Sequence, residues 1–148
     1  MSNDAPRIAP TSMPLQGSVV WKEDKHFIGT APSGKVVDID ANKEAGASPM
    51  ELVLLGLGGC ASYDVVSILG KCRQDVLDVR CALSAVRADA VPAVYTDIHL
   101  HFVVTGNDVK EKQVAKAVEL SADKYCSASK MLVDGGVRVT HSYEVVVG

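Results

Sequence analysis

The sequence contains few cysteines, and their spacing excludes two common uses of this residue. Only four occur among 148 residues, far apart and without a C-x-x-C pair: Cys60, Cys72, Cys81 and Cys126. A disulfide-stapled scaffold has a denser set, and a zinc knuckle has closely spaced pairs. We therefore expect reduced thiols.

The chain also lacks clusters of basic residues, and its formal net charge is −3. No group of Lys or Arg residues interleaves with aromatic residues, which argues against nucleic-acid binding. The N-terminus has no basic segment followed by an apolar run. The longest apolar stretch is interrupted by glycines, Ser62 and Asp64, so we expect no membrane span and a cytoplasmic protein.

Length and composition predict a single domain with its own core, since 47% of the residues are hydrophobic. Residues 1–14 hold three prolines and small polar residues without periodicity, which is typical of a flexible N-terminal arm. We expect the folded domain to comprise residues 15–148.

Residues 48–72 are predicted to form the central helix. Ser48 can cap it, Pro49 suits its first position, and Glu51 completes the pattern of a capping box. Apolar residues then occur all round the helix, which predicts burial on most of its faces.

Three glycines, Gly56, Gly58 and Gly59, lie in the middle of this helix, directly before Cys60. Each glycine disfavours a helix by about 1 kcal/mol relative to alanine, so we expect another part of the structure to approach this backbone closely. Two interpretations remain open at this point: Cys60 is a small buried apolar residue, or it is a reactive thiol.

The remaining elements follow from alternation and helical spacing. Residues 15–21, 26–31 and 35–40 are predicted as an antiparallel meander, and residues 76–89 and 95–105 as a hairpin. A second helix over residues 109–125 is predicted to be capped at Asn107 and Asp108. A short helical turn at 127–133 and a strand at 137–147 follow. This order indicates an α+β fold with antiparallel sheets packed on the helices.

Two cysteines suit peroxide chemistry, because a peroxide-reducing thiolate needs a second thiol that resolves its sulfenic acid. Cys60 on the central helix and Cys126 at the end of the second helix can supply such a pair, although spacing alone does not establish it. His99 and His101 share a strand face with Asp97. A metal site and an ordinary solvated face are the alternatives there, and the absence of a fourth-ligand pattern favours the solvated face.

Four segments carry a resemblance to a known family: SPMELVLLGLGGC at 48–60, DVVSIL at 64–69, HFVVTG at 101–106 and KYCSASKML at 124–132. In this order they resemble the superfamily of osmotically inducible protein C and organic hydroperoxide resistance protein, OsmC/Ohr, and most of all its YhfA-like subgroup. The resemblance extends from about Trp21 to the C-terminus.

The resemblance implies an OsmC-like fold, an intertwined homodimer with the long central helices in its interface, and a role for each thiol. Cys60 matches the peroxidatic position and Cys126 the resolving position. In the family, an organic hydroperoxide oxidises the first thiol and the second forms a disulfide with it. A lipoyl-type dithiol or another cellular thiol then reduces the pair, with no cofactor.

This chain departs from the family at the residues that activate the thiol. Members with strong peroxidase activity carry an arginine in the N-terminal strands, and residues 15–40 contain none. They also carry a glutamate near the start of the central helix, where this chain aligns Met50. Glu51 is one residue late, and nine helical residues place it opposite Cys60. The accessory candidates are therefore Glu51, Met50, Tyr63 and Asp64.

Two functions are predicted from these observations. The first is a thiol-dependent peroxidase that reduces organic hydroperoxides, and also hydrogen peroxide, in oxidative stress defence. The alternative is a dimeric OsmC-like protein that binds a small apolar ligand with little peroxidase activity. Met50, Leu57 and Met131 around Cys60 either line an apolar pocket for such a ligand or belong only to the core.

Overall fold

A computed structural model describes residues 8–9 and 13–148. These residues form two compact units, one that ends at Pro49 and one that runs from Met50 to Gly148. Most of the predicted N-terminal arm, residues 1–14, lies outside the described residues. The expectation of a single domain stays a prediction.

The first unit contains the predicted meander, which is confirmed. Strands β1 (Ser18–Glu23), β2 (His26–Thr30) and β3 (Val36–Asp40) form one antiparallel sheet in the order β1-β2-β3. Its two tight turns contain residues with positive φ, Asp24 at 47° and Gly34 at 88°. Glycine reaches such a conformation without a steric penalty, and aspartate tolerates it better than most residues.

The loop after β3 is organised by one carboxylate. Asp40 Oδ1 accepts from the Asn42 amide at 2.8 Å, and Oδ2 accepts from the Ala45 amide at 3.0 Å. These backbone hydrogen bonds, with that of Ala45 the strongest influence, lower the pKa of Asp40 below 3.8. The loop is thereby fixed just before the central helix.

The central helix α1 spans Pro49–Lys71, close to the predicted bounds. Within the single chain, only one stripe of the helix is buried, at helical spacing: Leu57, Gly58, Ala61, Val65 and Leu69. Burial on most faces therefore stays a prediction that depends on the expected dimer. Of the three mid-helix glycines only Gly58 is closely approached, since a Cβ there would lie 2.7 Å from Leu83 Cδ1, whereas Gly56 and Gly59 face open space.

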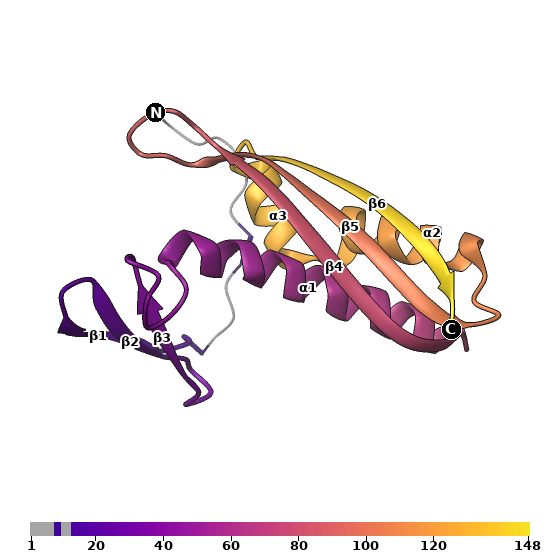
Figure 1. The fold of residues 1–148 in the computed structure, drawn as a ribbon, viewed down its shortest axis with the longest axis horizontal. Helices are drawn as coiled ribbons and strands as arrows, with labels where there is room; N and C mark the ends of the chain where they lie inside the picture. The colour runs from indigo at the N-terminus through magenta and orange to yellow at the C-terminus, as the bar shows by residue number, and fades with distance from the viewer. Residues whose placement is uncertain (1–7, 10–12) are drawn as a thin grey trace. The chain divides into compact units, whose positions relative to one another are not determined.

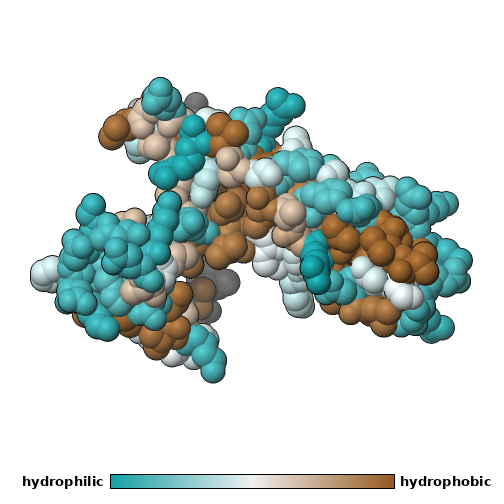
Figure 2. Space-filling model, viewed as in Figure 1, coloured by the Kyte–Doolittle hydropathy of each residue, from teal (hydrophilic) through white to brown (hydrophobic). Residues whose placement is uncertain are grey.

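Outside this stripe α1 exposes large apolar residues, and Figure 2 shows brown, hydrophobic residues on the surface in the region of this helix. Leu55 is 57% exposed, and Val53 and Val66 are also exposed. The helix is in addition long and apolar enough to cross a membrane by length and composition alone, a test that core helices also pass. Its buried stripe nevertheless packs into the core of the second unit, as in a core helix.

The second sheet contains β4 (Asp75–Arg87), β5 (Tyr95–Asn107) and β6 (Arg138–Val147) in the order β4-β5-β6. β4 and β5 form the predicted antiparallel hairpin. The predicted inner face of β5 is confirmed, because Ile98, Leu100, Phe102 and Val104 are at most 1% exposed. These side chains pack with the buried stripe of α1 in one core. Figure 1 shows α1 running alongside the sheet of β4, β5 and β6.

Strand β6 lies parallel to β5, which corrects the expectation of purely antiparallel sheets. The chain leaves the end of β5, passes through helical segments and returns to start β6 beside the beginning of β5. Such a crossover joins parallel strands, whereas a tight turn joins antiparallel ones. The fold remains α+β.

The predicted second helix, 109–125, is divided into two parts. α2 spans Glu111–Leu120 and is followed by a π-helical turn, η1, at Ser121–Tyr125, and by α3 at Ser127–Asp134. The predicted cap at Asn107 and Asp108 was wrong. The cap residue is Lys110. Asn107 instead ends β5, and the Asn107 side chain donates to Asp75.

Candidate functional site

Ser121, the first residue of η1, joins this turn to α1. The fully buried Ser121 hydroxyl donates to Asp64 Oδ2 at 3.1 Å and lies 3.3 Å from the Ala61 carbonyl. Its own carbonyl accepts from the Cys126 amide at 2.9 Å, the five-residue hydrogen bond of a π-helix. One residue therefore fixes the position of Cys126 relative to the helix that carries Cys60.

Cys126 lies between η1 and α3, and its side chain is the N-terminal cap of α3. Its backbone is extended, and its sulfur accepts from the Ser129 amide at 3.4 Å. The residue is 3% exposed. Sequence reasoning placed Cys126 after a helix, and the structure adds that it starts the next one.

The Cys60 thiol lies close enough to Cys126 to influence the ionisation of the Cys126 thiol. Burial is the main cause that raises the pKa of the Cys126 thiol, hydrogen bonds from Ser129 lower it part of the way, and the neighbouring Cys60 thiol raises it again. Cys60 is half-buried and packs against the core cluster that contains Cys126. All four cysteines are free thiols.

The accessory candidates separate into different environments. Asp64 belongs to the site through its hydrogen bond with Ser121, whereas Tyr63 is 73% exposed. Met50 packs against the core, and its carbonyl accepts from the Tyr95 hydroxyl at 2.6 Å. Glu51 is half-buried at the start of α1, and its capping-box role stays a prediction.

The residues that were expected to line an apolar pocket around Cys60 do not share one environment. Leu57 is fully buried in the core, whereas Met131 is 74% exposed. A cleft of about 370 Å³ instead lies farther along α1, between this helix, α2 and η1. Its lining includes Tyr63, Ile68 and Leu120.

A cavity of about 560 Å³ lies beside Cys126, between η1, α3 and β6. Cys126, Ser129 and His141 line it together. Ser129 Oγ and His141 Nε2 are buried and have no hydrogen-bond partner among the described residues. Sequence reasoning missed both residues, although His141 is the one strongly polar side chain among the inward positions 139, 141, 143 and 145 of β6.

His141 has a lowered pKa, because burial disfavours its charged form more than any other influence. His99 also lowers this pKa, and Asp123 of η1 raises it in part. The imidazole is therefore neutral at neutral pH, and one of its nitrogens can accept a proton.

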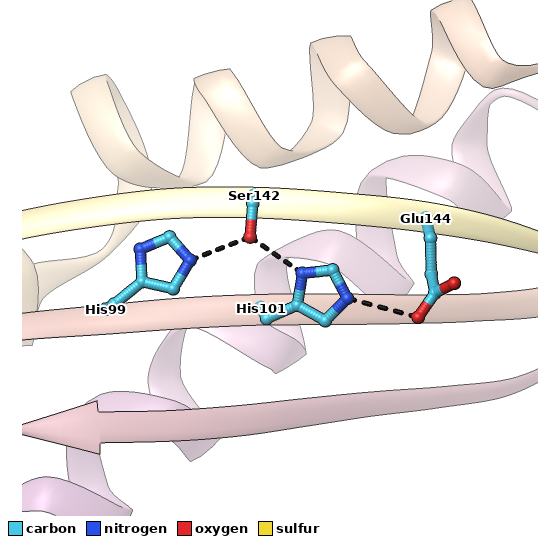
Figure 3. Close-up of polar contacts among 4 residues, drawn as sticks. All are labelled: His99, His101, Ser142 and Glu144. Atoms are coloured by element: carbon cyan, nitrogen blue, oxygen red, sulfur yellow. Dashed lines mark hydrogen bonds and ion pairs between the residues drawn. The ribbon is translucent and has the colours of Figure 1, made fainter.

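His99 and His101 form part of a polar network on the opposite face of the sheet (Figure 3). The two rings bracket the Ser142 hydroxyl, each at 2.7 Å, and His101 Nε2 lies 3.1 Å from Glu144 Oε1. His99 Nδ1 lies 2.7 Å from the Thr140 hydroxyl. Among residues 8–9 and 13–148, no group of three or more His, Cys, Asp or Glu side chains is arranged to hold a metal ion.

The remaining cysteines lie apart from this pair. Cys81 points from β4 towards the core, and burial raises the pKa of its thiol although Ser62 hydrogen-bonds to it. Cys72 follows the end of α1, and its carbonyl accepts from the Gln74 side chain at 3.2 Å.

Comparison with known proteins adds a family and several relatives. Residues 41–142 match the OsmC-like protein family. Protein YhfA from Escherichia coli strain K12 is 49% identical over 133 residues, which cover 89% of this chain and 98% of that protein.

Solved structures agree with this match. A hypothetical protein from Aquifex aeolicus VF5 superposes with a TM-score of 0.82 at 30% identity, over 92% of this chain and 98% of that one. An organic hydroperoxide resistance protein, OsmC, from Legionella pneumophila superposes with a TM-score of 0.66 over 91% and 99% of the two chains. At 15% identity, this last match is a likeness of fold alone.

Proposed function

The chain belongs to the OsmC-like protein family, in the YhfA-like subgroup of the OsmC/Ohr superfamily, and on that premise we propose that it is a thiol-dependent peroxidase. Its substrates are organic hydroperoxides and also hydrogen peroxide, and its redox pair is Cys60 and Cys126. The Legionella protein with the same fold bears the name of organic hydroperoxide resistance.

The observation that best supports this proposal is the influence of the Cys60 thiol on the Cys126 thiol, which requires the two side chains to be neighbours. Burial and the nearby Cys60 raise the pKa of Cys126, and Ser121 links the segment before Cys126 to α1. A thiol held next to a sulfenic acid forms a disulfide in an intramolecular step, which is favoured entropically.

The proposed cycle uses only sulfur chemistry. The Cys60 thiolate attacks the peroxide, the O–O bond breaks, and an alcohol and a Cys60 sulfenic acid are formed. The Cys126 thiol then attacks that sulfur and releases water, leaving a disulfide between the two residues. Two equivalents of thiol, or one lipoyl-type dithiol, return the pair to its reduced form and become oxidised themselves.

Differences between the two sulfurs support the assignment of roles. Cys126 is 3% exposed and has a raised pKa, so it stays a protonated thiol near neutral pH. Cys60 is more accessible, as the sulfur that meets the peroxide first needs to be. Because Met50 stands at the family's glutamate position and residues 15–40 contain no arginine, we expect slower turnover than in members with that pair.

The direct test exposes purified protein to one equivalent of cumene hydroperoxide and maps disulfides by mass spectrometry. We expect a bond between Cys60 and Cys126 in the wild type and none in Cys60→Ser. Cys72→Ser is the matched control, because Cys72 has no place in the proposed cycle. Peroxide consumption without this disulfide, or no consumption at all, would refute the proposal.

We also propose a cytoplasmic homodimer, as is common in this superfamily. The exposed apolar residues Val53, Leu55 and Val66 on one helix support an interface along α1. Leu55→Glu introduces a charge there and should shift the mass measured by light scattering from two chains to one. An unchanged dimer in this variant would place the interface elsewhere.

The cleft lined by Tyr63, Ile68 and Leu120 favours a second candidate function, the binding of a small apolar ligand. The pH dependence of Cys60 alkylation separates the two functions. A midpoint well below the ~8.5 of a free cysteine supports catalysis, and a midpoint at or above it supports binding.

A further inference from the structure

We propose that the cavity between η1, α3 and β6 binds the thiol that reduces the enzyme, and that His141 Nε2 takes the proton of this thiol. The inference rests on the proposed function, because it requires a disulfide between Cys60 and Cys126. The reductant enters from the side of η1, α3 and β6 and attacks the sulfur of Cys126, with His141 as the base.

Two buried polar atoms in this cavity lack partners, and they are the main support. Ser129 is 1% exposed, and neither its Oγ nor His141 Nε2 has a hydrogen-bond partner among the described residues. A buried polar atom without a partner destabilises a protein by about 1–3 kcal/mol, so such atoms in a cavity indicate a group that binds there. A ligand with a donor and an acceptor satisfies both.

The lining decides which sulfur is attacked. Cys126 lines the cavity together with these two residues, and Cys60 does not. A thiol bound in the cavity therefore faces the Cys126 end of the disulfide. Attack there releases Cys60, the sulfur that must be free again for the next peroxide.

The charged groups around the cavity indicate the class of thiol. Asp123 and Asp134 are balanced by Lys124 and Lys130, with Lys130 Nζ 2.8 Å from Asp134 Oδ2. A site with both signs suits a zwitterion, which carries an ammonium and a carboxylate group. The volume of about 560 Å³ exceeds the needs of a single amino acid and is sufficient for a short peptide. The structure thus favours cysteine or a small cysteine-containing peptide.

The proposed reduction balances in protons and electrons. His141 accepts the proton of the first thiol, the thiolate attacks Cys126 Sγ, and the electron pair of the broken S–S bond leaves with Cys60 as a thiolate. A second thiol loses its proton to solvent and attacks the ligand's own sulfur. The products are an oxidised thiol pair and a Cys126 thiolate, which takes back the proton held on His141.

Ser129 assists the last step. Its amide already donates to the Cys126 sulfur at 3.4 Å, and this backbone hydrogen bond lowers the pKa of that thiol in part. The hydroxyl has no hydrogen-bond partner among the described residues, so it is a donor available to the thiolate as it leaves. Two donors on one residue therefore stabilise the leaving sulfur.

The test separates oxidation from reduction. The disulfide is formed with diamide, and its reduction by cysteine, by glutathione and by 2-mercaptoethanol is followed by stopped flow. Each rate is divided by the rate of the same thiol with 2-hydroxyethyl disulfide. We expect the corrected reduction rates of cysteine and glutathione to exceed that of 2-mercaptoethanol. We also expect His141→Gln to slow reduction at least about tenfold, since a general base accelerates a reaction by about 10²–10⁴.

The pH profile identifies the base. The groups around His141 are Asp123 from η1, His99 from β5, and Lys130 and Asp134 from α3. In the wild type the reduction rate should fall below pH 6.5 more steeply than ionisation of the attacking thiol explains, because protonated His141 cannot accept a proton. His141→Gln should remove this additional decrease in rate. His101→Gln, on the opposite face of the sheet, should retain it.

A trapping experiment requires no variant. The disulfide form is treated with a monothiol, quenched with acid, and the mixed disulfide is located by mass spectrometry. An adduct on Cys126 supports the inference, and an adduct on Cys60 overturns it, as does unchanged reduction in His141→Gln. If peroxide fails to form the disulfide that diamide forms, the proposed function fails and the reductant site is still judged by these results.

Discussion

Replacing Ser121 by alanine tests whether this residue aligns the two thiols. The hydroxyl has one proton, which it donates to Asp64 Oδ2 at 3.1 Å while it lies 3.3 Å from the Ala61 carbonyl. Alanine removes this link between α1 and η1 and retains the backbone bond to the Cys126 amide. The expected effect is a looser position of Cys126 relative to Cys60.

The magnitude follows from the type of hydrogen bond. A bond to a charged group contributes about 1.5–3 kcal/mol, and the lower end applies because Asp64 is half-buried and regains water. If this free energy serves to keep Cys126 close to Cys60, its loss lowers the effective concentration of one thiol at the other, by tenfold for each ~1.4 kcal/mol. We expect Ser121→Ala to lower this effective concentration about threefold to tenfold.

The assay equilibrates the protein with reduced and oxidised glutathione and measures the fraction that carries the disulfide. Urea denaturation of the same samples gives the free energy of unfolding. Ser84→Ala, at an exposed position on β4, is the matched control and should change neither quantity. Loss of stability in Ser121→Ala with an unchanged effective concentration would refute the assignment of Ser121 as the link.

Three further predictions concern the fold. Gly58→Ala should be less stable than Gly70→Ala by about 1–3 kcal/mol in urea, because a methyl group at Gly58 meets a β4 leucine at 2.7 Å and one at Gly70 meets nothing within 4 Å. The pKa of Asp40 is lowered, so its bonds stabilise the loop above pH 3.8 and are lost as the pH falls through the folded value. Amide exchange at Ala45 should accelerate there, and Asp40→Asn should already exchange faster at pH 7. The pKa of His141 is also lowered, so the unfolded chain binds the proton first and the free energy of unfolding should decline as the pH falls below 6.5. His141→Gln should abolish this decline in urea titrations, and persistence of the decline would assign it to another group.

Local patterns in the sequence determined the elements of this protein. Pro49 and the residues around it set the start of α1, and the alternation in β5 identified its buried face. Both signals depend on residues a few positions apart, since helical and extended backbones present neighbours at fixed spacings. The four motifs likewise identified the superfamily that the comparisons confirmed.

Only the tertiary structure decided what surrounds each element. The same apolar spacing in α1 is compatible with full burial, yet only one stripe meets the sheet, because burial depends on the partners of a helix. The direction of β6 depended on the crossover through α2 and α3. The meeting of Cys60 with Cys126 and the unpartnered nitrogen of His141 arise from packing between distant segments, and local periodicity carries no information about such contacts.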